Sequence, residues 1–403
     1  MFKFKVYNSI AEEGIKELLD NGFQKNDDEP NAILLRSHKL DCKDMDNNLK
    51  CIARAGTGTN NIPVEEATKR GIVIFNTPGA NSNAVKELVL CGMLLASRGI
   101  IEGSLFTKSL ASSSSTSIND MMEKQKKQYK GNELKGKTLG IIGLGSVGSL
   151  LAQAAEVLGM KIIGYDPYIS VDGAWMLPKE VEKADDIKYL LQNSDYVSLH
   201  IPLNKDTKHF ISKETLKFFK KGIKLINLSR GDIVNNLDVI NALNNQILSK
   251  FITDFPTKEL IERVSKKNDV ILLPHLGAST KEAEINCAIM AAQQTKNFLL
   301  NGVIVNSVNF PKIKLGRTTE YRLVIIHKDE PGVIGNIAQA IASENLNVKD
   351  MINKSRNEIA ITLIDLEDNI SQYLMDKIYN IENIINSRVC YFLRENVIIF
   401  RLL

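Results

Sequence analysis

The sequence lacks the features that define membrane and secreted proteins. Its 403 residues contain no uninterrupted run of 18 or more apolar side chains, which a membrane-spanning helix requires. Its first residues, MFKFKVYNSIAEEG, place Lys and Glu where a signal peptide needs an apolar stretch. We therefore expect a cytoplasmic protein with no membrane segment.

Cysteine is also scarce. The sequence has five, an odd number, scattered along the chain and without a C-x-x-C pair. This pattern gives no sign of a disulfide framework and suits a reducing compartment. We expect neither a thiol nucleophile nor a bound metal; buried or incidental cysteines are the simpler interpretation.

Charge of one sign is not concentrated anywhere either. The formal net charge is only +4 and is spread along the chain, so composition does not favour nucleic-acid binding. A hydrophobic content of 44% is that of an ordinary globular protein, and the length predicts two or three domains.

One segment that is present indicates a cofactor. Residues 138–166 read as strand, glycine turn, helix, strand and acid, with Gly143, Gly145 and Gly148 at the G-x-G-x-x-G spacing and Asp166 about 20 residues further on. The glycines permit a tight turn, close approach of a pyrophosphate and close helix packing. A carboxylate at Asp166 accepts from a ribose 2′-OH and repels a 2′-phosphate, so NAD is favoured over NADP. Three glycines in an ordinary loop are the alternative.

The rest of the chain alternates strands and helices. Strands predicted at 3–8, 32–37, 50–56 and 72–77 form a small α/β unit, and those at 138–142, 161–165, 195–201, 223–229, 250–255 and 270–275 a doubly wound sheet. Helices are predicted at 83–98, 147–158 and 281–300, and a surface loop at Thr107–Asp120. Residues 321–328, 347–355, 358–367 and a strand ending near Phe400 complete a β-α-β-β-α-β, ferredoxin-like module.

Three side chains are candidates for acid–base and anion-binding chemistry. His275 and Arg230 each follow a predicted strand, at the edge where doubly wound sheets bind ligands. An imidazole exchanges protons near neutral pH, and a guanidinium binds a carboxylate. Glu259 follows the strand end at Asp254, from which its carboxylate could reach and orient the imidazole. From position alone, each of the three is more often a surface or packing residue. His38, His200, His209 and His327 share the titration range of His275, so residue type does not select the proton shuttle.

The segments RAGTGTNNI (54–62), KTLGIIGLGSVG (137–148), NLSRGDIV (227–234), TDFPTKE (253–259) and LLPHLGAST (272–280) together resemble the D-2-hydroxyacid dehydrogenase family. Within it, the chain is similar to the shorter bacterial members that end in an ACT domain. The resemblance implies a substrate-binding domain at 1–81 and 278–318, an NAD-binding Rossmann domain at 82–277 and an ACT regulatory domain at 319–403. It also implies oxidation of 3-phosphoglycerate with NAD⁺, the first step of L-serine synthesis, by a homodimer or homotetramer.

The resemblance assigns roles residue by residue. His275 becomes the acid–base group, Glu259 its partner and Arg230 the catalytic arginine. The implied cofactor contacts are Gly143, Gly145, Ser146, Val147, Gly148, Asp166, His200, Ile201, Pro202, Leu228, Ser229, Arg230, Asp254, His275, Leu276, Gly277 and Ala278. The implied substrate contacts are Arg36, Ser37, Arg54, Thr57, Gly58 and Asn81.

The chain departs from the family at several positions. D-F-P-T-K-E replaces the widespread D-V-F-P-x-E, which leaves Glu262 as the alternative to Glu259, and Lys86 stands where Ala is usual. In the ACT module, His327 and Asn347 match serine-contacting positions, but Asp329 replaces an Asn and would repel a carboxylate. Serine feedback and a pure assembly role therefore both stay open. Other activities also stay open: a glyoxylate, hydroxypyruvate or lactate dehydrogenase, or an NAD-binding amino-acid sensor with little turnover.

Overall fold

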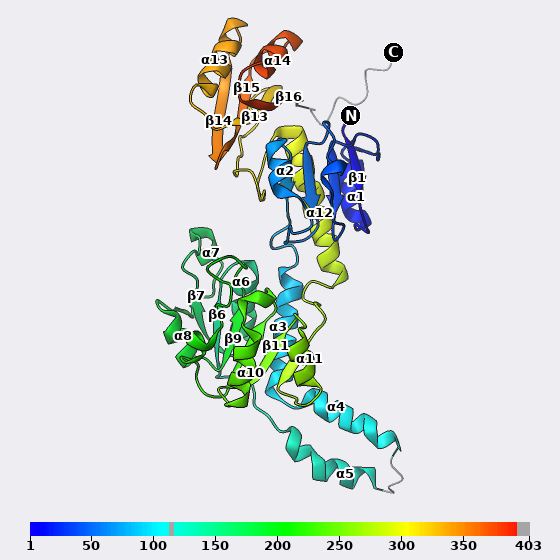
Figure 1. The fold of residues 1–403 in the computed structure, drawn as a ribbon, viewed down its shortest axis with the longest axis vertical. Coiled ribbons are helices and arrows are strands. Elements are labelled where there is room, and N and C mark those ends of the chain that lie inside the picture. Colours follow the sequence, from blue (N-terminus) through cyan, green and yellow to red (C-terminus); the bar gives the residue numbers. More distant parts are fainter. Residues whose placement is uncertain (113–116, 393–403) are drawn as a thin grey trace. The chain divides into compact units, whose positions relative to one another are not determined.

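The computed structural model describes residues 1–112 and 117–392, which form two compact units. The first unit combines Met1–Ala80 with the chain from Glu284 onward, and the second is Asn81–Ala283. Figure 1 colours both units along the sequence. The chain therefore leaves the first unit, builds the second and returns.

The first unit contains a five-stranded parallel sheet with the order β2-β1-β3-β4-β5, which is the flavodoxin-like order. Its strands are β1 (Lys3–Val6), β2 (Gln24–Lys25), β3 (Ala32–Leu35), β4 (Cys51–Arg54) and β5 (Val73–Phe75). The helices of this part are α1 (Glu12–Leu19), η1 (Cys42–Asp44), α2 (Val64–Lys69) and the long α12 (Lys281–Asn301).

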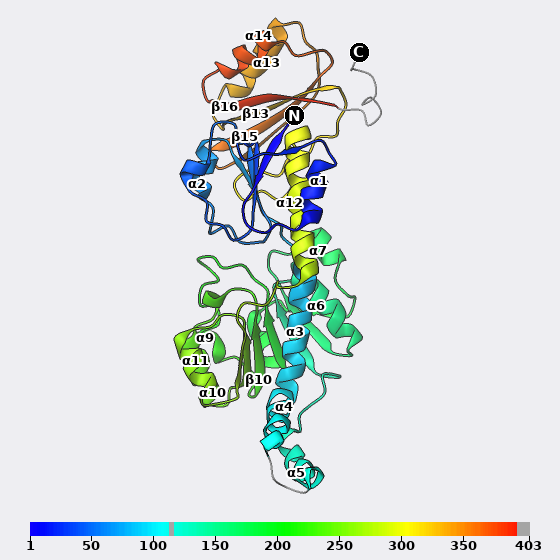
Figure 2. The same ribbon diagram turned by 90° about the vertical axis from the view of Figure 1, so that its right-hand side faces the viewer.

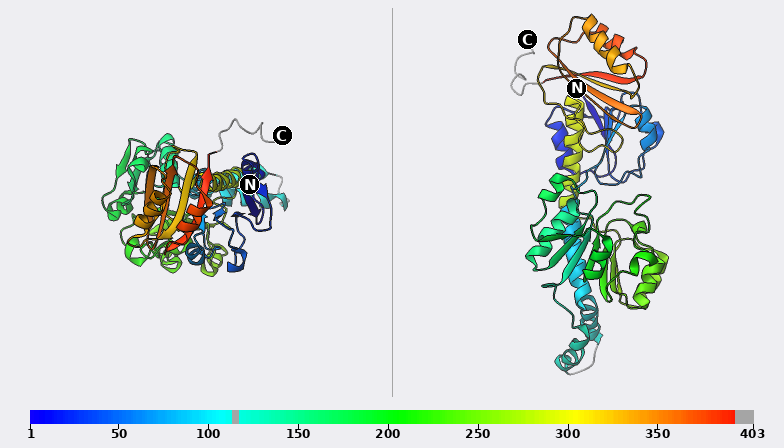
Figure 3. Two further views of the ribbon diagram at one scale, coloured as in Figure 1. Left: turned by 90° about the horizontal axis from the view of Figure 1, so that it is seen from above. Right: turned by 90° about the vertical axis from the view of Figure 1, so that its left-hand side faces the viewer.

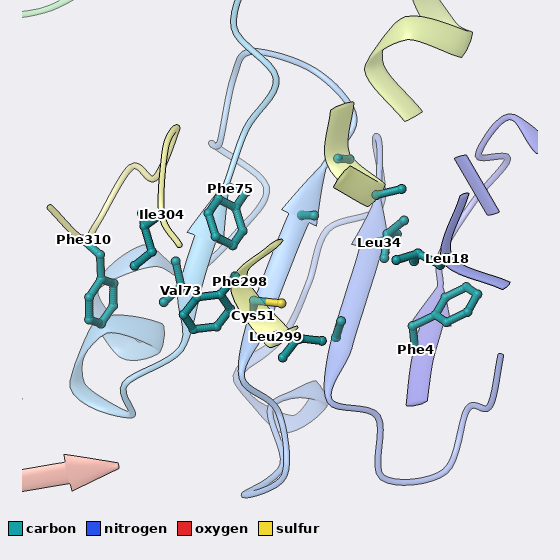
Figure 4. Close-up of a cluster of buried hydrophobic side chains, with 14 of the residues drawn as sticks. Phe4, Leu18, Leu34, Cys51, Val73, Phe75, Phe298, Leu299, Ile304 and Phe310 are labelled. Carbon is teal, nitrogen blue, oxygen red and sulfur yellow. The ribbon is translucent and has the colours of Figure 1, made fainter. Parts of the chain in front are cut away.

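Buried side chains on one face of this sheet form a continuous core with α1 and α12 (Figure 4). Phe4, Leu34 and Phe75 come from the strands, Leu18 from α1 and Phe298 from α12, and all five are fully buried. The strands are apolar on both faces because helices or loops cover both, as expected for a parallel sheet.

The second unit contains a seven-stranded parallel sheet with the order β12-β11-β10-β9-β6-β7-β8, in which the strand order reverses between β6 and β9. Its strands are β6 (Thr138–Ile142), β7 (Lys161–Tyr165), β8 (Val181–Lys183), β9 (Tyr196–Leu199), β10 (Ile223–Asn227), β11 (Leu248–Thr253) and β12 (Val270–Leu272).

Helices cover both faces of the seven-stranded sheet (Figure 2). One face packs against α3 (Ser82–Ser97) and α6 (Ser146–Val157). The other packs against α8 (Ile187–Asn193), α9 (Lys213–Leu216), α10 (Asn236–Asn244) and α11 (Lys258–Val264). The remaining helices of this unit are α4 (Ile100–Ser109), η2 (Leu110–Ser112), α5 (Ile118–Gln125), η3 (Lys126–Tyr129), α7 (Val171–Trp175) and η4 (Gly231–Ile233).

The C-terminal part of the first unit is a four-stranded antiparallel sheet with the order β14-β15-β13-β16. Its elements are β13 (Tyr321–Lys328), α13 (Val333–Ser343), β14 (Val348–Arg356), β15 (Ile359–Leu366), α14 (Gln372–Tyr379) and β16 (Ile384–Tyr391). The two helices cover one face of the sheet (Figure 3), while Val324, Ile326 and Ile361 on the other face join the core of the five-stranded sheet.

The predicted fold class is confirmed: two doubly wound α/β sheets and a ferredoxin-like module. Two local expectations need comment. The loop predicted at Thr107–Asp120 is wrong at both ends, because α4 runs to Ser109, η2 follows it and α5 begins at Ile118; residues 113–116 lie outside the described residues. Thr107 and Ser109 donate their hydroxyls to carbonyl oxygens of their own helix, so these residues fit a helix without losing a hydrogen bond. The strand predicted to end near Phe400 is β16, which ends at Tyr391; residues 393–403 lie outside the described residues.

Within the described residues, no single helix is long and apolar enough to cross a membrane. The pair α3 and α4, bent by 68°, passes that test on length and composition alone.

A buried ion pair lies within the C-terminal sheet, and its arginine also bonds to the rest of the first unit. Arg322 on β13 donates to both carboxylate oxygens of Asp365 on β15, at 2.5 and 2.8 Å, and neither side chain is exposed to solvent. The same guanidinium donates to the carbonyl oxygens of Asn301, Leu315 and Gly316. Because Asn301 ends α12 and the other two lie in the following linker, one side chain ties three segments together.

The Asp365 carboxyl is stabilised in its charged form. Burial alone would raise its pKa, but the hydrogen bonds from Arg322 and Thr318 bring the pKa below its ordinary value. The stability that this pair contributes is therefore present at neutral pH and is lost as the pH falls through the lowered pKa.

Arg322→Met should destabilise the first unit by about 3–5 kcal/mol, because it leaves the Asp365 charge buried without its partner. The double variant Arg322→Met/Asp365→Leu should recover most of that loss, since it removes both charges. Urea denaturation at neutral pH measures both effects. A single variant as stable as the wild type would show that the pair does not hold the sheet in place.

Candidate functional site

The candidate cofactor residues follow one row of strand ends in the second unit. The pairing register of the parallel strands aligns the last residues of β7, β6, β9, β10, β11 and β12, namely Tyr165, Ile142, Leu199, Asn227, Thr253 and Leu272. The residues that come next along each strand include Asp166, Gly143, His200, Leu228 and Asp254. The first loop residue after each of these six strands therefore lies at the same edge of the sheet.

The glycine turn after β6 has the geometry that a pyrophosphate needs. Gly143 has a φ of 92°, which side-chain-bearing residues rarely adopt, and a Cβ there would lie 2.6 Å from the carbonyl oxygen of His200. A Cβ at Gly148 would lie 2.1 Å from the carbonyl oxygen of Gly143, so only glycine lets α6 pack this close. A Cβ at Gly145 would meet no atom within 4 Å, which leaves open space at the start of α6.

Asp166 lies where the two strands flanking the turn end. One carboxylate oxygen accepts from the backbone N–H of Leu144 at 2.8 Å, and the other accepts from that of Tyr168 at 2.9 Å. The carboxylate therefore joins the glycine turn to the end of β7. Its negative charge at this place suits a ribose diol and disfavours a 2′-phosphate. The donor set and the open space at the start of α6 fit an NAD-type dinucleotide.

His200 follows β9, and its ring is held next to the sheet. Its Nε2 lies 2.8 Å from the hydroxyl of Ser198, and burial lowers the pKa of His200 to about 4. The next residues are tied to the neighbouring segment, because the hydroxyl of Ser229 donates to the carbonyl oxygen of Ile201 at 2.6 Å. The segments beginning at His200 and at Leu228 thus form one connected wall.

The loop that carries His275 is organised by Asp254. The carbonyl oxygen of Asp254 accepts from the N–H of His275 at 3.1 Å, and its carboxylate oxygens accept from the N–H groups of Leu276 at 2.7 Å and Gly277 at 2.6 Å. Asp254 is 1% exposed, whereas His275 is exposed. A buried acid therefore fixes the backbone on which the accessible imidazole stands.

His275 itself has an unusual backbone conformation. Its φ is 59°, in the left-handed region that non-glycine residues seldom occupy. Its ring meets the edge of Phe255 in a T-shaped arrangement, with centroids 5.2 Å apart. The hydrogen bonds of this loop to Asp254 hold the backbone in this conformation.

Arg230 and Glu259 are placed differently from each other. Arg230 lies just beyond β10, is exposed, and donates to the carbonyl oxygen of Ser229 at 2.6 Å. Glu259 is exposed in the first turn of α11, where its own backbone N–H and the Thr257 hydroxyl hydrogen-bond to the carboxylate and lower its pKa. Glu262, the alternative, is also exposed on α11. In this structure the Glu259 carboxylate bonds at the N-terminus of α11 and not to His275, so their pairing stays a prediction.

The candidate substrate residues of the first unit also lie at strand ends. Arg54 ends β4 and Arg36 follows β3, and the register pairs Leu35 with Arg54. The Nε of Arg54 donates to the carbonyl oxygen of Arg36 at 2.9 Å, and its Nη1 donates to that of Gly58. Arg54 thus shapes the backbone of the loop that contains Thr57 and Gly58.

Arg36 has a partner that sequence analysis did not identify. Its guanidinium forms a 2.7 Å ion pair with Glu284 near the start of α12, and both side chains are partly exposed. Ser37 is exposed beside it. Asn81 belongs to the second unit, where it precedes α3. Glu284 is distant from Arg36 along the chain, so no local sequence pattern indicates this ion pair.

The candidate effector residues do not gather at one place within this chain. His327 is 1% exposed, and its ring nitrogens lie 2.7 Å from the carbonyl oxygen of Lys328 and 3.0 Å from the hydroxyl of Thr362. Asp329 is exposed beside it, while Asn347 donates to Glu367 beyond the other end of β15. A ligand site that includes both His327 and Asn347 would therefore require two copies of the C-terminal module.

Comparison with known proteins adds to this geometry. A family model described as the NAD binding domain of D-isomer specific 2-hydroxyacid dehydrogenases matches residues 96–277. The D-3-phosphoglycerate dehydrogenase of Dictyostelium discoideum is 33% identical over 343 residues, which are 83% of this chain and 79% of that protein. The chain belongs to the D-isomer specific 2-hydroxyacid dehydrogenase family.

Other members of this family show how far the similarity reaches. The D-3-phosphoglycerate dehydrogenase of Methanocaldococcus jannaschii is 35% identical over 311 residues, and the match spans 75% of this chain but only 55% of that longer protein. The NAD⁺-bound 3-phosphoglycerate dehydrogenase of Entamoeba histolytica superposes with a TM-score of 0.59 at 29% identity, covering 76% of this chain and 98% of that one. The predicted cofactor, NAD, is confirmed by the matched NAD-binding domain.

The His200 environment predicts how stability depends on pH. A histidine whose pKa is lowered in the folded state is protonated first in the unfolded state, so stability falls as the pH drops from about 6.5 towards about 4. His200→Gln should remove this contribution and reduce the loss of stability between about pH 7 and about pH 5 by on the order of 1 kcal/mol. Urea denaturation at the two pH values measures it. Equal losses in variant and wild type would contradict the lowered pKa.

Proposed function

We propose that this family member is a D-3-phosphoglycerate dehydrogenase, which oxidises 3-phosphoglycerate to 3-phosphohydroxypyruvate with NAD⁺ and so opens L-serine biosynthesis. The observation that carries the proposal is the similarity to proteins of this name, four of which are 30–37% identical over 70–85% of the chain. The two arginines at the edge of the five-stranded sheet favour a substrate with a phosphate group, because paired guanidinium groups suit a dianion.

The proposed chemistry divides between the cofactor and the protein. When bound, NAD⁺ would supply the acceptor for the hydride that leaves C2 of the substrate. His275 takes the proton of the C2 hydroxyl, and Glu259 stabilises the imidazolium that forms. Arg230 holds the substrate carboxylate and the C2 oxygen, because its planar guanidinium offers two parallel donors. Asp254 positions His275 by holding the backbone of the loop that carries it.

Binding of the phosphate is assigned to the first unit. Arg36 and Arg54 supply the positive charge, and backbone N–H groups around Thr57 and Gly58 hold the substrate carboxylate. The ion pair with Glu284 partly neutralises Arg36, so in this proposal the incoming phosphate competes with that carboxylate.

The proposal is tested by NADH formation from a panel of hydroxyacids: 3-phosphoglycerate, D-lactate, D-glycerate and glycolate. 3-Phosphoglycerate should give the highest kcat/KM by a wide margin. A higher value for an unphosphorylated acid would assign the chain to another activity of its family, and no turnover with any of them would favour an NAD-binding sensor.

His275→Asn should reduce kcat by about 10²–10⁴-fold while NADH binding is retained, because the acid–base group is lost but the cofactor contacts stay. Asparagine tolerates the left-handed backbone of this position. His209→Asn is the matched control, since His209 is exposed and has a similar φ of 54°. Substantial activity in the His275 variant would remove His275 from this role.

Arg54→Ala should raise KM for 3-phosphoglycerate by about 30-fold or more, with NAD affinity unchanged, because a charge-assisted contact contributes about 2 kcal/mol or more. Glu284→Gln should change KM in the opposite direction, since it frees Arg36 from its competing carboxylate. Arg70→Ala, on the surface of the same unit, serves as the neutral control. An unchanged KM in the Arg54 variant would defeat the phosphate assignment and leave the hydride chemistry intact.

We also assign the chain to a cytoplasmic homodimer or homotetramer. All five cysteines are free, as suits a reducing compartment. Helix α4 has no buried residue although it is apolar, and it leaves Ile100, Ile101 and Leu105 exposed. Such a surface suits contact with a second copy. The C-terminal module is proposed as the place where L-serine acts, and the positions of His327 and Asn347 at opposite ends of β15 then require a paired module.

A further inference from the structure

The edge of the seven-stranded sheet opposite the glycine turn carries a second candidate site. Here lie the amino ends of β6, β9 and β10, and the register places Leu139, Tyr196 and Lys224 side by side. A cavity of about 180 Å³ opens at this edge. It adjoins a wider depression of about 580 Å³ with which it shares Asn132, Gly222 and Lys224.

The lining of the smaller cavity is strongly basic. It has four lysines, Lys137, Lys220, Lys221 and Lys224, against a single carboxylate, Asp195. The local charge excess is large for a chain whose total formal charge is only +4 over 403 residues. Converging cations of this kind create a positive potential that attracts an anion.

Both oxygens of the single carboxylate, Asp195, already accept a hydrogen bond. One oxygen of Asp195 accepts from Nζ of Lys220 at 2.7 Å, and the other accepts from the backbone N–H of Thr138 at 2.9 Å. Lys220 is thereby paired. Across the described residues, neither Lys137 nor Lys224 forms an ion pair with any carboxylate.

Lys224 is held in place although it lacks an anionic partner. It is half-buried, and its Nζ lies 4.7 Å from the ring centroid of Tyr196, which is itself buried and bonded through its hydroxyl to Ser97 at 2.7 Å. Burial lowers the pKa of Lys224 and the nearby charge of Lys137 adds to this, while Asp195 opposes it. Two half-buried ammonium groups that repel each other would both be stabilised by an anion between them.

We propose that this cavity binds a small phosphate-bearing anion through Lys137 and Lys224, with Lys221 at the rim. The site is separate from the glycine turn, because it lies at the opposite ends of the same strands. The cavity is large enough for a single phosphate group, and the wider depression beside it leaves room for an organic part attached to that phosphate. Inorganic phosphate and a phosphate monoester are the two sources of this chemistry.

Calorimetric titration of the full chain with inorganic phosphate at low, constant ionic strength tests the proposal. Arg54→Ala should be the background, so that the proposed substrate site does not contribute. In that background, adding Lys224→Met or Lys137→Met should weaken phosphate binding at least tenfold, whereas adding Lys217→Met, at an exposed lysine paired with Glu214, should leave it unchanged. The methionine keeps the apolar stem and removes only the charge.

Two further measurements complete the test. Lys224→Arg should retain binding, which separates loss of charge from loss of fold, and all variants should show the NAD affinity of the background. Titration with glycerol 3-phosphate distinguishes the sources, since tighter binding than inorganic phosphate that also depends on Lys224 indicates a monoester. Phosphate binding that is absent, or that is equal in the Lys224→Met and Lys217→Met variants, would overturn the proposal.

Discussion

The alignment of parallel strands in the second unit is the constraint on which its function depends. Each strand pairs with its neighbour in a fixed register, and a shift of one residue would move every side chain to the other face. The register therefore brings the residues after β6, β7, β9, β10, β11 and β12 to one edge, although the first and last of them, Gly143 and Leu273, are far apart along the chain. Hydrophobic burial on both faces fixes that register, so the core of the sheet and the position of the cofactor residues have the same cause.

Two carboxylates at the strand ends, Asp166 and the buried Asp254, then shape the loops at this edge. Asp166 joins the glycine turn to the end of β7, and Asp254 holds the backbone from His275 to Gly277. In both cases the two oxygens of one carboxylate accept from backbone N–H groups that would otherwise lack partners at the ends of strands. The exposed, reactive side chains can therefore be accessible without being loosely held. Arg322 has the corresponding role in the first unit, with the charges reversed, because its guanidinium satisfies carbonyl oxygens of α12 and the linker.

Much of this arrangement could be predicted from the sequence. Apolar runs located the main strands to within a few residues, and the three glycines and Asp166 indicated the dinucleotide. The positions of Arg230 and His275 just after strands marked them as candidates, whereas Asp254 was assigned only through the family resemblance. The two-residue strand β2 and the short β8 were missed, because two or three residues carry too little periodicity to be seen. The two ends of the segment at 107–120 were misjudged because serine and threonine are common in loops, whereas the hydroxyls of Thr107 and Ser109 bond to acceptors inside their own helix. Glu284 was missed as the partner of Arg36, since an ion pair between residues far apart in sequence leaves no local pattern.

The sequence by itself determined the types of element, the fold class and the family, because these depend on local periodicity, turn residues and short motifs. Only the tertiary structure decided which of several similar side chains became buried, paired or free. His200 and His275 are the same residue type after strands of the same sheet, yet the first has its pKa lowered by burial and the second stands exposed on a left-handed backbone. Lys220 and Lys224 likewise differ in whether a carboxylate reaches them. Burial and partner choice depend on residues that are distant along the chain, and only folding brings them into contact.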